Sequence, residues 1–275
     1  MIKVVGGVEL SRFFYPVSDE LAMVEIELNN LIQSIGINHI KNIMDDIGCV
    51  RYKYLRAGII LLAAKSVEKD PSKSADTQII HLASIMELIF HAVFVHNQIG
   101  EKNERYFDST DIENKIAVLV GDSLYTRAFF AAAQILPVNM FRIISDLTLK
   151  MCLAEIKEEV LNDSAVSIEK YFELIEEKTA VFFSTCCKLS ADLVSAGESE
   201  KIYLEKIGLN LGMLYQISVD FANVQPCLPV DFDIQKLGSF AIDAENSISY
   251  LKDSIYKNKL LELLNYFTAQ IKLNH

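Results

Sequence analysis

The sequence predicts an all-α protein, because apolar residues recur at three- and four-residue spacing along nearly the whole chain. In the first long segment this spacing is shown by Leu21, Val24, Leu28, Leu31 and Ile35. Alternation of apolar and polar residues, the pattern of a strand, never continues for more than about four residues. The chain has 275 residues, of which 51% are hydrophobic, so it can bury a sizeable core. We expect one helical domain over residues 1–275.

Residues that start and stop helices divide the chain into segments. Ser18, Asp19 and Glu20 are typical of a helix start, whereas Gly36 and Gly48 are typical of helix ends. Proline residues fall between periodic segments, at positions 71, 137, 226 and 229. The predicted helices span residues 18–35, 38–48, 51–69, 75–98, 111–135, 138–161, 167–196, 199–223, 234–256 and 257–272.

Some of the predicted helices are apolar on more than one face, namely 75–98, 111–135 and 199–223. In a soluble protein such helices are surrounded by other helices, which predicts a central helical layer. The polar segments 100–110 and 223–233 directly follow two of them. Helical bundles build their sites from residues on facing helices, so we expect a site where these two helices end.

The charge and hydropathy of the chain argue against two kinds of partner. Lys and Arg number 26 against 37 Asp and Glu, which gives a formal charge of -11. The basic residues are scattered, whereas nucleic-acid binding needs them gathered on one surface. The longest strongly apolar run, residues 57–64, is far shorter than the roughly 20 residues of a transmembrane helix, and the N-terminus lacks the pattern of a signal peptide. We expect a soluble, cytoplasmic protein without a nucleic-acid partner or an integral membrane segment.

The cysteines predict reduced thiols rather than disulfides or a metal site. Five are present, which is an odd number, and no two have the C-x-x-C spacing of a zinc or redox site. Cys186 and Cys187 are adjacent, so on a helix their side chains point about 100° apart and cannot both bind one metal ion. The others are Cys49, Cys152 and Cys227.

Five stretches of the chain carry a resemblance to one protein family. They read KYLRAGIILLAA, MELIFHAVFVHNQIGE, IAVLVGDSLYTRAFFAA, IEEKTAVFFSTCCKLSADLVSA and IGLNLGMLYQISVDFAN. In this order they resemble the basic helix start, the first aspartate-rich helix, the Gly-Asp helix, the Lys-Thr-Ala motif and the second aspartate-rich helix of the trans-isoprenyl diphosphate synthase (polyprenyl synthetase) family. The matching residues include Gly121 and Asp122 in the third stretch and Gly208 and Gly212 in the fifth.

The resemblance implies an isoprenoid-synthase-type helical bundle, a single domain with a central cavity that usually forms a dimer. In this family an allylic diphosphate ionises, and the carbocation is captured by isopentenyl diphosphate. The departing diphosphate needs magnesium ions, which prefer carboxylate oxygens as ligands. Two DDxxD motifs facing each other across the cavity supply those carboxylates in the family.

Both aspartate-rich motifs are altered in this chain. Their aspartate positions are occupied by Asn97, Gln98, Glu101, Val219, Asp220 and Asn223. Only Glu101 and Asp220 keep a carboxylate, and a neutral amide cannot offset the charge of a metal ion. We therefore assign no catalytic residue, and Glu101 and Asp220 are the only metal-ligand candidates. Mg²⁺ is expected as a cofactor only if some activity is retained.

Residues for binding diphosphate are better preserved. Lys53 and Arg56 are three residues apart, so they share a helical face, and both match family positions for isopentenyl diphosphate. Lys178, Thr179 and Gln216 stand where the family contacts the allylic diphosphate. For the three basic residues, ion pairing within the protein is an equally ordinary alternative.

Other basic positions of the family have changed. Phe90 stands where the family has a histidine, and no lysine occurs between Lys206 and Lys236, where one is expected. The Arg-Arg pair that follows the first motif has only Lys102 and Arg105 as candidates. These losses add to the loss of the aspartates.

Three functional hypotheses follow from the resemblance. The first is a catalytically degenerate partner or regulatory subunit of an active prenyltransferase, in a homodimer or heterodimer. The second is a residual or altered prenyltransferase that condenses an allylic diphosphate with isopentenyl diphosphate. The third is a protein that binds an isoprenoid or isoprenyl diphosphate without reaction.

The dimer face is expected around residues 116–135. This stretch mixes the bulky Leu119, Leu124, Phe129 and Phe130 with the small Ala131, Ala132 and Ala133. Large and small apolar residues on one helix suit packing against another chain, although packing inside the protein's own bundle explains them equally well.

Overall fold

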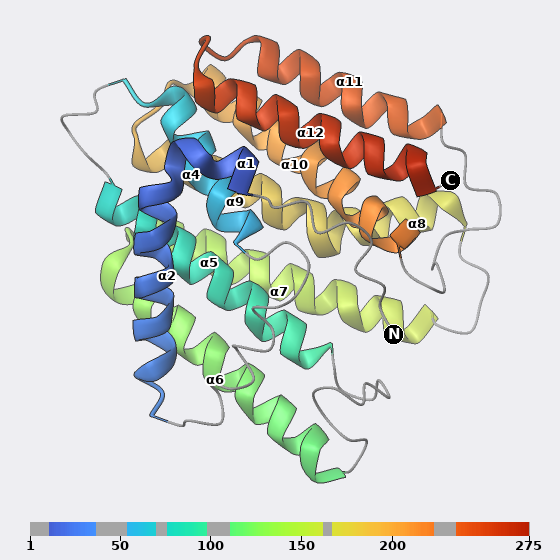
Figure 1. Ribbon diagram of the computed structural model, residues 1–275. Coiled ribbons are helices and arrows are strands. Elements are labelled where there is room, and N and C mark those ends of the chain that lie inside the picture. The colour runs from blue at the N-terminus through green and yellow to red at the C-terminus, as the bar shows by residue number, and fades with distance from the viewer. Residues whose placement is uncertain are drawn as a thin grey trace. The chain divides into compact units, whose positions relative to one another are not determined.

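The computed structural model describes residues 11–36, 54–69, 76–97, 111–161, 167–222 and 235–274, and every regular element in these ranges is helical (Figure 1). The all-α prediction is therefore confirmed. The elements are α1 (Ser11–Phe14), η1 (Tyr15–Val17), α2 (Ser18–Gln33), α4 (Leu55–Val67), α5 (Asp76–His96), α6 (Asp111–Ile135), α7 (Val138–Leu161), α8 (Ile168–Ile175), η3 (Glu176–Ala180), α9 (Val181–Leu193), α10 (Glu198–Ala222), α11 (Gln235–Ser249) and α12 (Ile255–Asn274).

The chain divides into two compact units. The first, called the α5 unit below, holds α2, the start of α4 through Gly58, α5 and α6. The second, called the α10 unit, holds α1, α4 from Ile59, α7 from Arg142, and α8 to α12. The expectation of a single domain with a central cavity stays a prediction.

Helix α10 is the centre of its unit. It packs against α9, α11, α12 and η3, and α11 and α12 also pack against each other (Figure 1). Two glycines of α10 allow close approach: a Cβ atom on Gly208 would lie 2.5 Å from the Phe183 carbonyl oxygen, and one on Gly212 would lie 2.6 Å from the Cα of Ala180. The glycine spacing seen in the sequence therefore serves backbone-to-backbone packing of α10 against η3 and α9.

The prediction of one continuous helix over 167–196 is wrong in its middle. The structure has α8, then the π-helical turn η3, then α9. A π turn inserts an extra residue into a helix and is common at functional sites. Here it contains Lys178 and Thr179, so this local change in winding determines where these two side chains lie.

The prediction for the last two helices also needs a correction. They were expected over 234–256 and 257–272, but α11 ends at Ser249 and α12 begins at Ile255. The polar sequence of this connection is the physical reason, because Ser254 caps α12 by accepting a hydrogen bond from the Lys257 amide at 3.1 Å. The predicted helix 38–48 lies outside the described residues.

Within the described part of the α5 unit, two helices have the length and composition of membrane spans, although neither contains a long uninterrupted apolar run. They are Thr77–His96 in α5 and Lys115–Ile135 in α6. In the first helix, 72% of the most apolar window is buried inside the fold, as is usual for a core helix. In the second helix, the buried share of that window is 39%. Composition alone therefore does not distinguish a buried helix from a membrane span in α5.

The three described cysteines take part in no disulfide bond. Cys186 and Cys187 are buried in α9, and Cys152 is exposed on α7. Burial raises the pKa of the Cys187 thiol to about 12, so this side chain stays protonated and inert. Cys49 and Cys227 lie outside the described residues.

Candidate functional site

Arg56 is held inside the α5 unit by Glu87 rather than extended toward solvent. Its Nε and Nη2 atoms donate to Glu87 Oε2 at 3.2 and 2.7 Å, and the Ala57 amide donates to Glu87 Oε1 at 3.0 Å. Arg56 is 2% exposed and Glu87 is fully buried. A buried charge needs a paired and hydrogen-bonded partner, which explains why this carboxylate stands in an otherwise apolar stretch of α5.

Phe90 completes the surroundings of Arg56. The guanidinium carbon lies 3.6 Å from the centroid of the Phe90 ring, a cation–π contact. His91 is also close, with Nε2 4.0 Å from Glu87 Oε2. The residue that replaces the family's histidine thus helps to hold Arg56 in place. Lys53, the other predicted residue for isopentenyl diphosphate, lies outside the described residues.

The end of α5, where the first altered motif begins, packs against α6 through His96. A Cβ atom on Gly121 would lie 2.1 Å from His96 Nε2, so a larger residue there would require the His96 ring to move. His96 Nε2 lies 3.3 Å from the Val118 carbonyl oxygen and 3.4 Å from Asp122 Oδ1. Asn97 is exposed at the last described position, and Gln98 and Glu101 lie outside the described residues.

Asp220, the carboxylate kept in the second motif, is enclosed by protein. The Tyr171 hydroxyl donates to Oδ2 at 2.7 Å, and Gln216 Nε2 donates to Oδ1 at 2.9 Å. Gln216 in turn accepts from the Thr179 hydroxyl at 2.8 Å. Three residues predicted from the sequence therefore form one hydrogen-bonded chain on α10 and η3, and Tyr171 of α8 closes it. Val219 is partly buried beside Asp220, and Asn223 lies outside the described residues.

The carboxyl group of Asp220 is harder to ionise than an ordinary aspartate. Burial raises its pKa to about 6, against the hydrogen bonds from Tyr171 and Gln216 and the positive charge of Lys178, which lower it. A carboxylate that is desolvated and has a donor on each oxygen is poorly suited to bind a metal ion. Among the described residues, moreover, no group of three or more His, Cys, Asp or Glu side chains could hold one.

We expect Asp220 to make the free energy of unfolding fall as pH rises from about 4 to about 6. Its folded-state pKa of about 6 lies above the value of about 4 for an unfolded chain, so the folded state binds the proton more tightly in that window. A shift of about two units corresponds to roughly 3 kcal/mol. Asp220→Asn, which stays uncharged, should therefore be more stable than the natural protein by up to roughly 3 kcal/mol at pH 7 and nearly equal to it at pH 4. Urea unfolding of both proteins from pH 4 to pH 7 tests this, and a difference that is constant with pH would contradict it.

Lys178 lies between two carboxylates of α7. Its Nζ atom is 3.0 Å from Glu155 Oε2 and also contacts Glu158 Oε2. Burial works to lower the pKa of the Lys178 ammonium, but the negative charges of Glu155 and Glu158 outweigh it and raise that pKa. The lysine that the family uses for a diphosphate is thus charged and already paired.

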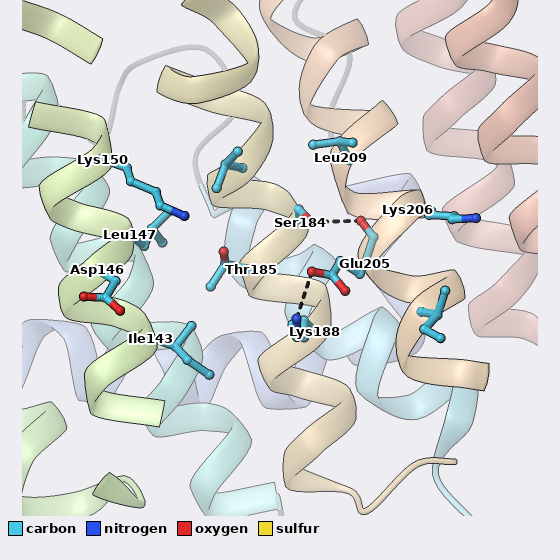
Figure 2. A pocket seen from close by; sticks show the side chains of 12 residues that line it. Ile143, Asp146, Leu147, Lys150, Ser184, Thr185, Lys188, Glu205, Lys206 and Leu209 are labelled. Atoms are coloured by element: carbon cyan, nitrogen blue, oxygen red, sulfur yellow. Dashed lines mark hydrogen bonds and ion pairs between the residues drawn. The ribbon is translucent and has the colours of Figure 1, made fainter. Parts of the chain in front are cut away.

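A groove on the α10 unit lies between α7, α9 and α10 (Figure 2), with a volume of about 530 Å³. In its lining, Lys188 of α9 pairs with Glu205 of α10 at 2.9 Å, and the Ser184 hydroxyl donates to the Glu205 carbonyl oxygen at 3.0 Å. Its apolar lining consists of Ile143, Leu147, Val181, Ile202 and Leu209. None of the site residues predicted from the sequence lines this groove, so it is separate from the Asp220 chain.

The hydrogen-bond and ion-pair partners of the predicted residues were not predicted from the sequence. They are Glu87, Tyr171, Glu155 and Glu158. Glu87 carried a signal, because a lone carboxylate within an apolar helix must find a cation when it is buried. Tyr171 and the two glutamates carried none, because their contacts depend on how separate helices pack.

Comparison with known proteins adds a family and several relatives. The family model described as polyprenyl synthetase matches residues 37–227. A prenyl transferase of Cyanidium caldarium is 26% identical over 225 residues, covering 78% of this chain and 67% of that protein. An octaprenyl diphosphate synthase of Haemophilus influenzae is 29% identical over 173 residues, covering 61% of this chain and 51% of that protein. The chain thus matches about half the length of the second relative.

Solved structures match over nearly the full chain. A polyprenyl synthase of Caulobacter crescentus, crystallised with calcium and isoprenyl diphosphate, has a TM-score of 0.81 at 16% identity and covers 95% of this chain and 98% of that one. A decaprenyl diphosphate synthase of Rhodobacter capsulatus has a TM-score of 0.78 at 18% identity, covering 95% and 99%. These likenesses establish the all-helical isoprenoid synthase fold.

Proposed function

Because the chain belongs to the polyprenyl synthetase family, a family of isoprenoid biosynthesis, we propose that it is a catalytically degenerate partner or regulatory subunit of an active prenyltransferase. The observation that carries this proposal is the enclosure of Asp220, the one carboxylate of the second motif, by other protein groups. Both of its oxygens accept hydrogen bonds inside the protein, and burial opposes its ionisation. Function follows the site rather than the fold, and the only motif carboxylate among the described residues is already held by protein donors.

A residual or altered prenyltransferase is the second candidate, and it would depend on Glu101 and Asp220 to hold Mg²⁺. The observation in its favour is that Lys178, Thr179 and Gln216 lie together beside Asp220. The surroundings of Asp220 do not fit a magnesium ligand, however, because a metal ion would have to displace its bonds from Tyr171 and Gln216. This mismatch favours the non-catalytic proposal.

We expect the purified protein alone not to condense isopentenyl diphosphate with dimethylallyl, geranyl or farnesyl diphosphate in the presence of magnesium. The reason is that the departing diphosphate would lack the charge that metal ions at two aspartate motifs provide. A radiolabelled condensation assay measures this directly. Turnover on the order of 1 per second that is lost in Asp220→Ala would contradict the proposal and support the second candidate.

Exposed apolar residues on α7 support the partner role. Leu149, Leu153, Ile156 and Val160 are 48 to 80% exposed, and their spacing of four, three and four residues places them along one side of the helix. Such spacing is typical of a helix that packs lengthwise against another. We infer that this apolar stripe contacts a second, catalytically intact prenyltransferase chain, or a second copy of this one in a homodimer.

The face expected on 116–135 divides into two parts in the structure. Leu124, Ala131 and Ala132 are buried within the protein's own packing, whereas Leu119 is 65% exposed and Phe130 is 52% exposed. The alternative of internal packing thus holds for the first group. Leu119 and Phe130 remain available for a partner, and the partner itself stays a prediction.

We expect Leu149→Glu with Ile156→Glu to abolish a complex with an active prenyltransferase from the same source. Two charges buried in an apolar interface of about 2,000 Å² would be strongly unfavourable. Ile242→Glu on α11 is the matched control, because Ile242 is 57% exposed and each of the two α7 residues is 59% exposed. Light scattering after co-expression gives the stoichiometry, and product chain length reports any effect on the enzyme.

The outcomes of this experiment separate the candidates. A complex that the α7 variant loses and the Ile242→Glu variant keeps would support the subunit role. A protein that is monomeric alone and after co-expression, with no effect on the enzyme's activity or product length, would remove it. The hypothesis of an isoprenoid-binding protein would then remain.

A further inference from the structure

Lys178 forms ion pairs with two side chains of α7. Glu155 and Glu158 are three residues apart, so they lie on one face of α7 and reach the same ammonium group. The Lys178 side chain is only 23% exposed, and Glu155 is 25% exposed. The Glu158 side chain is more open, at 45% exposed, so the pair with Glu155 is the better shielded from water and is screened less than a surface ion pair.

A second ion pair, at the surface, connects the same two segments. Lys157 of α7 donates to Glu177 Oε1 at 2.9 Å and to Oε2 at 2.6 Å, and Glu177 directly precedes Lys178 in η3. Each segment thus contributes a lysine to carboxylates of the other. In this reciprocal arrangement Glu155 and Glu158 face the π-helical turn that carries Lys178.

The charge balance around Lys178 is negative. Two lysines, Lys157 and Lys178, are set against the carboxylates of Glu155, Glu158 and Glu177. Asp220, whose electrostatic interaction with Lys178 favours its ionised form, adds a fourth carboxylate at neutral pH. A multiply charged anion entering this region would meet more negative than positive charge.

We propose that Glu155 and Glu158 determine the ligand specificity of this region by occupying the Lys178 ammonium, so that diphosphate and other phosphate anions are excluded. The inference rests on the proposed function, because it gives a further reason, besides the lost motif aspartates, why the chain would not act as a prenyltransferase. An anion would have to displace two carboxylates that are held in place by the fold. It would also be repelled by them afterwards, since both would lie within a few ångströms of the new charge.

The test is binding of inorganic pyrophosphate, measured by calorimetry without metal ions, to the full chain and to variants. The natural protein should bind weakly or not at all. Glu155→Gln with Glu158→Gln keeps side-chain size but removes both charges, and it should bind pyrophosphate at least about tenfold more tightly. Adding Lys178→Gln to this variant should remove the gain, because the ammonium is the group that the anion reaches.

Glu177→Gln is the matched control, because it removes one carboxylate next to Lys178 in sequence that pairs with Lys157 instead. It should leave pyrophosphate affinity within about twofold of that of the natural protein. An equal gain in this control would overturn the inference, since it would show a general effect of net charge. Tight binding of pyrophosphate by the natural protein would also overturn it.

Thermal unfolding followed by circular dichroism establishes that each variant is folded before binding is measured. If the double variant does not fold, the single variants Glu155→Gln and Glu158→Gln replace it, and each should bind about threefold more tightly than the natural protein. No gain in a folded single variant would overturn the inference. These results are independent of the partner experiment, which measures complex formation, so failure of one proposal can be told from failure of the other.

Discussion

Glu87→Ala should lower the free energy of unfolding by about 3–5 kcal/mol, the usual cost of removing one partner of a buried ion pair. The substitution leaves the Arg56 guanidinium, which is 2% exposed, without its carboxylate. It also removes the acceptor of the Ala57 amide. The guanidinium carbon would still lie 3.6 Å from the centroid of the Phe90 ring. A desolvated cation–π contact contributes about 2 kcal/mol or more, but it provides no hydrogen-bond acceptor to replace the carboxylate.

Urea unfolding measures this change, and a paired substitution provides the control. Arg56→Met with Glu87→Leu removes both charges and keeps apolar volume, so it should be far less damaging than Glu87→Ala alone. A loss below about 1 kcal/mol for Glu87→Ala would mean that Arg56 finds water or another partner. In that case the guanidinium would be available for a diphosphate, as the family resemblance implied.

Gly208→Ala should destabilise the protein by about 1–3 kcal/mol, although alanine is the better helix former. The new Cβ atom would lie 2.5 Å from the Phe183 carbonyl oxygen and 2.8 Å from the Cα of Ser184. Both are backbone atoms of α9, so α9 and α10 would have to move apart. That movement would also disturb the hydrogen bond from Ser184 to the Glu205 carbonyl oxygen.

Gly238→Ala on α11 is the matched control for this helix-packing prediction. Nothing lies within 4 Å of the position that its Cβ atom would take. Only helix propensity acts there, so this variant should be more stable by about 0.5–1 kcal/mol. The two substitutions are chemically identical and are expected to differ in sign. An increase in stability for Gly208→Ala would mean that the contact between α9 and α10 yields easily.

The sequence was sufficient to predict most of the helices in the described ranges, because helical periodicity and helix-ending residues are local signals. The boundaries expected for 111–135 and 138–161 coincide with α6 and α7. The π turn within 167–196 was missed, because its hydrogen bonds leave no mark in composition. In the folded chain Gly212 of α10 packs against Ala180, which lies in that turn. No sequence pattern shows which helix a glycine will pack against.

The sequence by itself determined which chemical groups are present at the motif positions. Asn97, Gln98, Val219 and Asn223 carry no ionisable side chain in any fold. Tertiary structure alone decided what the remaining charged groups contact. Arg56 and Glu87 are 31 residues apart, and Asp220 and Tyr171 are 49 apart. Ion pairs and buried hydrogen bonds form only where helix packing brings such groups together and removes water, so the pairing of Lys178 with α7 and the raised pKa of Asp220 could not be read from the residues alone.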